Sequence, residues 1–207
     1  MTDQDPAIRA HYAKLALKRL RAYPEGKWAE IREHIDAEAL TEIREIASSE
    51  WLAVGRFVAV CEAIRGVLGE VAAREFWTDL MRDSYDHGLL KPLTMAAQIG
   101  FGQSGLGQSG ASKLLRTGPR AWALSTQACG DIEYVDDGEV GMRLRGVDLI
   151  PEILHSKGFA CVFYGACRAM LELFKSRGEV RIYEHLPPGA ERPQIGRASC
   201  RERVCYV

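Results

Sequence analysis

Asp131-Ile-Glu-Tyr-Val-Asp-Asp-Gly-Glu-Val-Gly-Met-Arg-Leu-Arg145 is the stretch that decides the fold of this chain. Asp137-Gly138 is a strong turn signal, because a primed hairpin turn needs positive φ angles, which Gly adopts easily. On both sides of the turn, apolar side chains alternate with polar or small ones, as in a strand with one buried face. The pattern therefore predicts a β-hairpin with Val140, Met142 and Leu144 on its buried face.

A long amphipathic helix is predicted after the hairpin. Residues 151–177 have a helical pattern, with Pro151 in the first turn, Asp148 as N-terminal cap and Gly178 as C-terminal cap. At about 100° per residue, a strip of small residues runs beside an arc of large apolar ones. The strip, which is expected to let the helix lie close to a sheet, consists of Gly158, Val162, Gly165 and Ala169. The arc, which is expected to fill the space beside it, consists of Phe159, Phe163, Ala166, Met170, Leu173 and Phe174.

Helical patterns dominate the chain before the hairpin. We expect helices at 7–21, 28–48, 51–68 and 71–87, and a further one at 113–127 that a Gly-Pro pair interrupts. The helix at 51–68 is the most apolar and is therefore expected to be central. After the long helix, residues 179–184 alternate as a closing strand. This order predicts an α+β fold: a helical N-terminal half, then a β-hairpin, a long helix and a closing strand, with an antiparallel sheet packed on helices.

One domain is expected, because 207 residues is an ordinary domain size. It should span residues 1–190, with a helical part at 7–127 and the hairpin, helix and strand at 131–184. Residues 191–207 are expected to form a disordered tail. From Ile195 onward the Arg-rich, non-periodic sequence resembles the translation of a sequencing adapter, and it is set aside in predicting the fold.

Four features support a resemblance to a known superfamily. They are the hairpin and the segments Trp51-Leu-Ala-Val-Gly-Arg-Phe57, Val67-Leu-Gly69 and Leu114-Leu-Arg-Thr-Gly-Pro-Arg-Ala-Trp122. Over most of residues 51–184 the chain resembles proteins of about this length from myxobacteria and their relatives. The order of elements is similar to that of the superfamily of transport protein particle (TRAPP) core subunits, 4-vinyl-reductase domains and haem nitric-oxide-binding domains.

The resemblance implies an α/β sandwich around an apolar pocket. Such pockets take lipid-like, tetrapyrrole or aromatic ligands, or the domain pairs with another subunit. Haem or another tetrapyrrole is therefore the cofactor that the resemblance suggests. The chain nevertheless lacks the clustered cysteines of 4-vinyl-reductase domains, and no histidine matches a proximal haem ligand. A small apolar or aromatic ligand and a second copy of the chain are the partners that it suggests.

An apolar cavity is expected where the arc of the long helix meets the hairpin and the helix that carries Trp122. The ligand-binding residues that we expect there are Trp122, Tyr134, Phe159, Phe163 and Met170. Sites of this kind are mostly apolar and measure roughly 300 Å³ or more. No combination of acid, base and nucleophile is recognisable, and no metal site is expected. The predicted function is a small-molecule-binding or sensory module, and the alternative is a scaffold or dimerisation domain without a ligand.

Composition narrows the range of partners. The net charge of −1 at pH 7 provides no overall attraction to nucleic acid or anionic lipid. No apolar run approaches the roughly 20 residues of a membrane span. Of the six cysteines, two lie in the tail and the others form no Cys-x-x-Cys pair. This pattern favours free thiols in a reducing cytoplasm.

A glycine repeat is the most conspicuous motif outside the hairpin. Gly100-Phe-Gly-Gln-Ser-Gly-Leu-Gly-Gln-Ser-Gly110 contains Gly-x-Gly-x-x-Gly twice, which alone would suggest a dinucleotide site. No buried strand precedes it, and no acidic residue follows in the setting of a βαβ unit. Close helix packing or a hinge loop is therefore favoured, and a ligand lid is the intermediate hypothesis.

Further residues have both a functional and a structural interpretation. His155 is the one histidine worth testing as a ligand, although surface histidines are more common. Asp79, Asp83 and Asp86 could act as acid and base, but helix-surface charge is the commoner explanation.

Cys61 could carry a thioester-linked acyl chain, as the resemblance to TRAPP subunits allows, but a core cysteine is favoured. Lysines and arginines near the N-terminus form a basic cluster, namely Lys14, Lys18, Arg19 and Arg21. This cluster could contact RNA or a membrane, but a solvated helix face explains it better.

Overall fold

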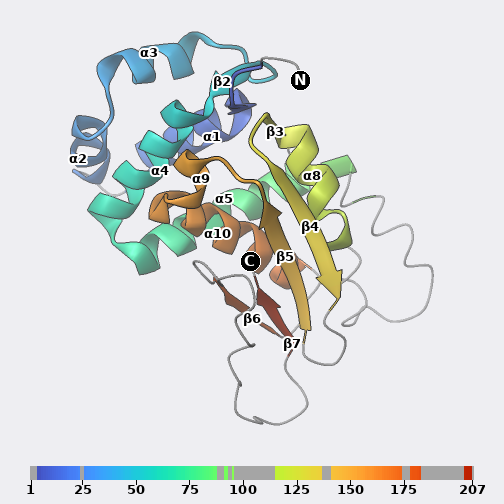
Figure 1. The fold of residues 1–207 in the computed structure, drawn as a ribbon. Helices are drawn as coiled ribbons and strands as arrows, with labels where there is room; N and C mark the ends of the chain where they lie inside the picture. Colours follow the sequence, from blue (N-terminus) through green and yellow to red (C-terminus); the bar gives the residue numbers. More distant parts are fainter. Residues whose placement is uncertain are drawn as a thin grey trace.

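The computed structural model describes residues 4–23, 26–87, 91–92, 95, 115–136, 141–173, 178–182 and 203–206. These residues form an α+β fold in which helices of the N-terminal half and one C-terminal helix enclose the core, with a sheet on one side (Figure 1). The predicted fold class is therefore confirmed. The Asp-Gly turn of the hairpin and the glycine repeat at 100–110 lie outside the described residues.

Five helices make up the described part of the N-terminal half: α1 (Ala10–Arg21), α2 (Lys27–Glu33), α3 (Ala37–Glu45), α4 (Val54–Leu68) and α5 (Glu70–His87). The single helix expected at 28–48 is wrong, because Asp36 starts a new helix there. Its carboxylate accepts a hydrogen bond of 2.6 Å from the backbone N–H of Glu38, which caps α3. The helix expected at 51–68 contains α4, which is central as predicted, since Phe57, Val60, Cys61 and Ile64 are fully buried.

A small sheet that the sequence did not reveal joins three distant segments. Its strands are β1 (Ala7–Arg9), β2 (Trp51–Ala53) and β3 (Thr126–Gln127), in the order β2-β1-β3. Both pairings are antiparallel, with Ile8 opposite Leu52 on one side and Thr126 on the other. Residues 7–9 and 51–53, which were expected to start helices, are therefore strands that precede α1 and α4.

The predicted hairpin is confirmed. Strands β4 (Asp131–Asp136) and β5 (Gly141–Val147) pair antiparallel, with Tyr134 opposite Leu144. The sheet is not wholly antiparallel, however. The closing strand β6 (Gly178–Arg181) is linked to β5 through β7 (Arg203–Tyr206), which runs parallel to both. Residues 203–206 are the described part of the segment that was expected to be a tail, and they form this strand.

The long helix after the hairpin is interrupted near its start. Helix α9 (Pro151–Leu154) is followed by α10 (Lys157–Leu173), whose first turn is capped by the Ser156 hydroxyl, 2.9 Å from the N–H of Phe159. One expected cap is wrong: Asp148 has a positive φ of 50° and does not cap α9, whose N-terminal cap residue is Ile150. Gly178, expected to cap the C-terminus of the long helix, is the first residue of β6, and the residues between it and α10 lie outside the described ones.

The small strip of α10 meets other helices, which corrects the expectation that it would lie on a sheet. A Cβ at Gly158 would be 2.5 Å from the backbone carbon of Cys61 in α4, and one at Gly165 would be 2.5 Å from that of Trp77 in α5. The glycines therefore allow α10 to lie directly on the backbones of both helices. The large arc points the other way, toward α8 (Gly118–Ser125) and the hairpin, which lie side by side in Figure 1.

Candidate functional site

A cavity of about 100 Å³ lies where α1, α5, α8, α10 and the hairpin meet. Its lining includes Leu144 from β5 and Val162 from α10, so the small strip meets other helices at its glycines but borders the cavity at Val162. Of the three hairpin residues expected on the buried face, only the Leu144 side chain is among the described ones. The walls are almost entirely apolar, and the lining contains no Asp, Glu, Lys, Arg or His among the described residues.

Four of the five residues predicted for the site line this cavity: Trp122, Phe159, Phe163 and Met170. Tyr134 does not line it. Its ring is half-buried and lies 5.4 Å below the guanidinium of Arg116, although it shares the face of the hairpin with Leu144. Period-two alternation identifies the face of a strand, but it does not say which residue along that face meets the cavity.

Aromatic rings form one wall of the cavity. Trp122 and Phe163 are stacked at 5.5 Å between centroids and 25° between planes. Phe159 contacts Phe163 edge-on at 5.3 Å and is itself only 2% exposed. The Trp122 ring is held in place by its indole N–H, which donates a 2.8 Å hydrogen bond to the carbonyl of Gly130. This wall is therefore rigid and suited to an apolar or aromatic surface.

Hydroxyl groups that the sequence analysis did not single out form the polar part of the lining. Tyr12 of α1 and Ser125 of α8 share a hydrogen bond of 2.9 Å. The Thr126 hydroxyl donates to the carbonyl of Trp122 at 2.9 Å, and that of Tyr85 donates to the carbonyl of Ala166 at 3.3 Å. Burial raises the pKa of Tyr12, while the hydrogen bond to Ser125 acts in the opposite direction. The helical spacing of the buried residues of α1 includes Tyr12. The sequence therefore contained a signal that this side chain points into the core.

The cavity does not fit the tetrapyrrole that the superfamily resemblance suggests. A haem group would need several times the volume of about 100 Å³, and the described lining contains no histidine. His155 is exposed at the C-terminal end of α9. No group of three His, Cys, Asp or Glu residues that could hold a metal ion occurs in the described part of the chain.

The four cysteines whose side chains the structure describes are core residues. Cys61, Cys129, Cys161 and Cys167 are buried and not bonded to one another. Burial raises the pKa of the Cys61 thiol well above its ordinary value. Because the thiolate is the nucleophile, this burial opposes the attachment of an acyl chain to Cys61.

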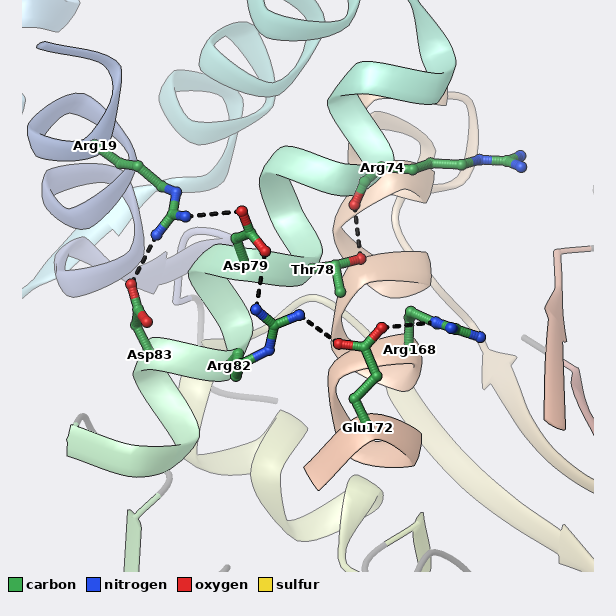
Figure 2. Close-up of polar contacts among 8 residues, drawn as sticks. All are labelled: Arg19, Arg74, Thr78, Asp79, Arg82, Asp83, Arg168 and Glu172. Atoms are coloured by element: carbon green, nitrogen blue, oxygen red, sulfur yellow. Dashed lines mark hydrogen bonds and ion pairs between the residues drawn. The ribbon is translucent and has the colours of Figure 1, made fainter. Parts of the chain in front are cut away.

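Two acidic residues of α5, Asp79 and Asp83, take part in ion pairs that connect three helices (Figure 2). Arg19 of α1 binds the carboxylates of Asp79 at 2.9 Å and Asp83 at 2.7 Å. Arg82 bridges Asp79 to Glu172 of α10. Asp79 and Asp83 are therefore explained by helix-surface pairing, as favoured above, and the side chain of Asp86 is outside the described ones.

The same ion pairs account for part of the basic cluster on α1. Arg19 is held by the two aspartates, and Lys14 donates a 3.0 Å hydrogen bond to the carbonyl of Arg44 in α3. Both contacts are made within the protein. They therefore favour the interpretation of the basic cluster as a solvated helix face over its interpretation as a surface for nucleic acid or membrane.

A carboxylate from α4 fixes the N-terminus of α10. One oxygen of Glu62 accepts from the Ser156 hydroxyl at 2.7 Å and from the N–H of Gly158 at 2.8 Å. The other accepts from Arg65 at 3.1 Å. Burial acts to raise the pKa of Glu62, but the three hydrogen bonds outweigh it and the pKa is lowered. This contact sets where the aromatic arc of α10 begins.

Comparison with protein-family models, curated proteins and solved structures finds no match for this chain. None of the described helices combines the length and apolar character needed to cross a membrane. The cavity and its lining are therefore the features of the described structure that point to a function.

Proposed function

We propose that the chain is a small-molecule-binding or sensory module whose ligand occupies the cavity beside α10. The observation that carries this proposal is a cavity walled by rigid aromatic rings and free of ionisable carboxylates and basic groups among the described residues. Sites with mostly apolar walls and a few polar groups are the usual form of small-molecule sites.

The size of the cavity restricts the ligand. At about 100 Å³ it is well below the roughly 300 Å³ expected from the sequence, so that expectation is wrong for this conformation. An apolar cavity of roughly 150 Å³ is enough to hold benzene. Met81 and Met170 line the cavity, and methionine side chains readily change rotamer to admit a ligand. A single-ring compound is therefore the largest ligand that the site would admit, and it would enter only with such a change of methionine rotamers.

The second candidate function is a scaffold or dimerisation domain without a ligand. The small cavity favours it, because a nearly filled core needs no occupant. The large apolar side chains that are exposed among the described residues belong to separate segments, namely Val71, Met95, Leu124 and Leu154. An interface usually presents a continuous apolar patch of several hundred Å², so the oligomeric state in solution is the observation that decides this candidate.

Native mass spectrometry and ligand-observed NMR with toluene test the first candidate against the second. We expect a monomer that binds toluene, and an Ala166→Leu variant that does not, because the larger side chain fills the cavity from α10. A matched control is Ala72→Leu on α5, which lies outside the cavity lining. A stable dimer with no toluene binding by the wild type would favour the scaffold function.

A further inference from the structure

The paired hydroxyls of Tyr12 and Ser125 leave one hydrogen-bond donor without a partner. Two hydroxyl groups carry two protons, and one proton is used in the 2.9 Å bond between them. Neither side chain forms another hydrogen bond with the residues that the structure describes. Tyr12 is 4% exposed and Ser125 is 8% exposed, so bulk water does not readily supply the missing acceptor.

The other hydroxyls of the lining differ from this pair. Thr126 and Tyr85 direct their protons to the backbone carbonyls of Trp122 and Ala166. Their donors are therefore used within the protein. The pair on α1 and α8 is the polar feature of the described lining that still has a proton to offer to a ligand.

The surroundings of the pair determine which ligand could use this proton. A buried donor without a partner is unfavourable by roughly 1–3 kcal/mol, so an acceptor placed there gains affinity. No charged side chain lines the described cavity, so a carboxylate or ammonium ion would lose its hydration without compensation. The stacked rings of Trp122 and Phe163 favour a planar, aromatic body.

We propose that the site selects a neutral, single-ring aromatic compound with a carbonyl oxygen, which accepts the spare proton of the Tyr12–Ser125 pair. The ring contacts the wall formed by Trp122, Phe159 and Phe163, and the oxygen points toward α1 and α8. This inference rests on the proposed ligand-binding function and names the class of ligand and the residues that distinguish it.

The test compares benzaldehyde with styrene, which has the same planar shape but no acceptor, and with benzoate, which is charged. Dissociation constants are measured by ligand-observed NMR on the full chain. We expect benzaldehyde to bind about fivefold more tightly than styrene, which is the gain of an ordinary hydrogen bond. Benzoate should bind more weakly than either.

Variants assign this preference to the hydroxyl pair. Tyr12→Phe or Ser125→Ala each leave one hydroxyl and should keep part of the preference. The double variant should bind benzaldehyde no more tightly than styrene, because the carbonyl then loses its hydration without gaining a donor. The control is Thr78→Val, which removes a buried hydroxyl that donates to the carbonyl of Arg74, away from the cavity lining (Figure 2). It should retain the full preference.

The outcomes separate this inference from the function on which it rests. Equal binding of benzaldehyde and styrene by the wild type, or a preference that survives in the double variant, overturns the role of the hydroxyl pair and leaves a ligand site in place. Failure of all three compounds and of toluene to bind overturns both. If the double variant does not fold, the wild-type comparison and the single variants decide the question.

Discussion

Phe159 and Phe163 lie in the same wall of the cavity but differ in burial. Phe159 is 2% exposed and contacts Phe57, Trp122 and Phe163, whereas Phe163 is half-buried and faces the cavity. The first is mainly a core residue, and the second is mainly a lining residue. The two side chains should therefore respond differently to the same truncation.

We expect Phe159→Ala to lower the free energy of unfolding by about 3–5 kcal/mol, the usual range for a buried aromatic residue. Phe163→Ala should lower it by roughly 1–2 kcal/mol, because part of that side chain already faces empty space. Urea denaturation of both variants measures the difference. Equal losses would mean that the cavity is closed in solution and that Phe163 is part of a filled core.

The carboxylate of Glu62 gives the protein a specific dependence on pH. Its pKa is lowered from an ordinary value of 4.5, so its stabilising contribution is fully present above that value. The contribution is lost as the pH falls through the lowered pKa of the folded state. Glu62→Gln should be about 1 kcal/mol less stable than the wild type at neutral pH, since it loses charge-assisted hydrogen bonds.

The difference between Glu62→Gln and the wild type should shrink as the pH falls below 4.5. Thermal melts from neutral to acidic pH test this, with Glu75→Gln as the control, a carboxyl on α5 that makes no described ion pair with α10. A difference that stays constant with pH would show that the geometry of the Glu62 side chain, not its charge, holds the start of α10.

At the scale of elements, the contact of α10 with α4 and α5 is the central packing interaction. It depends on two glycines of α10 that meet backbone atoms, and backbone cannot move aside as a flexible side chain can. The aromatic arc therefore faces away from those helices and is left to form the cavity wall. The position of the cavity follows from which face of α10 carries the small residues.

Gly165→Ala should destabilise the fold by about 3 kcal/mol or more, since its methyl group would meet the Trp77 backbone. Gly66→Ala in α4 is the matched control, because a Cβ there meets nothing within 4 Å. Alanine also favours the helix, so this variant should be more stable than the wild type by roughly 0.5–1 kcal/mol. Both values come from chemical denaturation. If the two substitutions have the same sign, the close approach of α10 to α5 is wrong.

The sequence predicted individual helices and strands better than it predicted which elements pack against one another. The hairpin was found because alternation and a turn pair are local signals, and the aromatic arc because helical period is local too. The sequence did not reveal which partner the glycine strip would meet, since a small surface fits a helix as well as a sheet. The cap at Ser156 was missed because Asp148 and Pro151 already offered a plausible start for one continuous helix.

At the scale of the whole molecule, long-range pairing was the least predictable feature. The strands of the small sheet are two or three residues long, too short to show alternation, and they come from segments far apart in the chain. The Tyr12–Ser125 pair was missed for the same reason, because α1 and α8 come together only in the folded protein. Four of the five expected site residues were nevertheless placed at the cavity, since they belong to two strongly patterned helices.

The tail provides a prediction at this scale. Strands β5 and β6 both run parallel to β7, and α10 connects them, as expected of a crossover unit. A chain ending at Gln194 should therefore pair β5 directly with β6 and keep a cooperative unfolding transition. Amide hydrogen exchange of Val180 measures this, and loss of its protection would show that residues 203–206 are needed for the sheet.

The three-stranded sheet β2-β1-β3 positions the Tyr12 and Ser125 hydroxyls at the cavity. Ile8 of β1 stands opposite Thr126 of β3; α1 with Tyr12 follows the first strand, and Ser125 immediately precedes the second. A backbone ladder of two residue pairs thus fixes the position of α1 relative to α8. Breaking this ladder would therefore separate Tyr12 from Ser125 and remove the hydrogen bond between them.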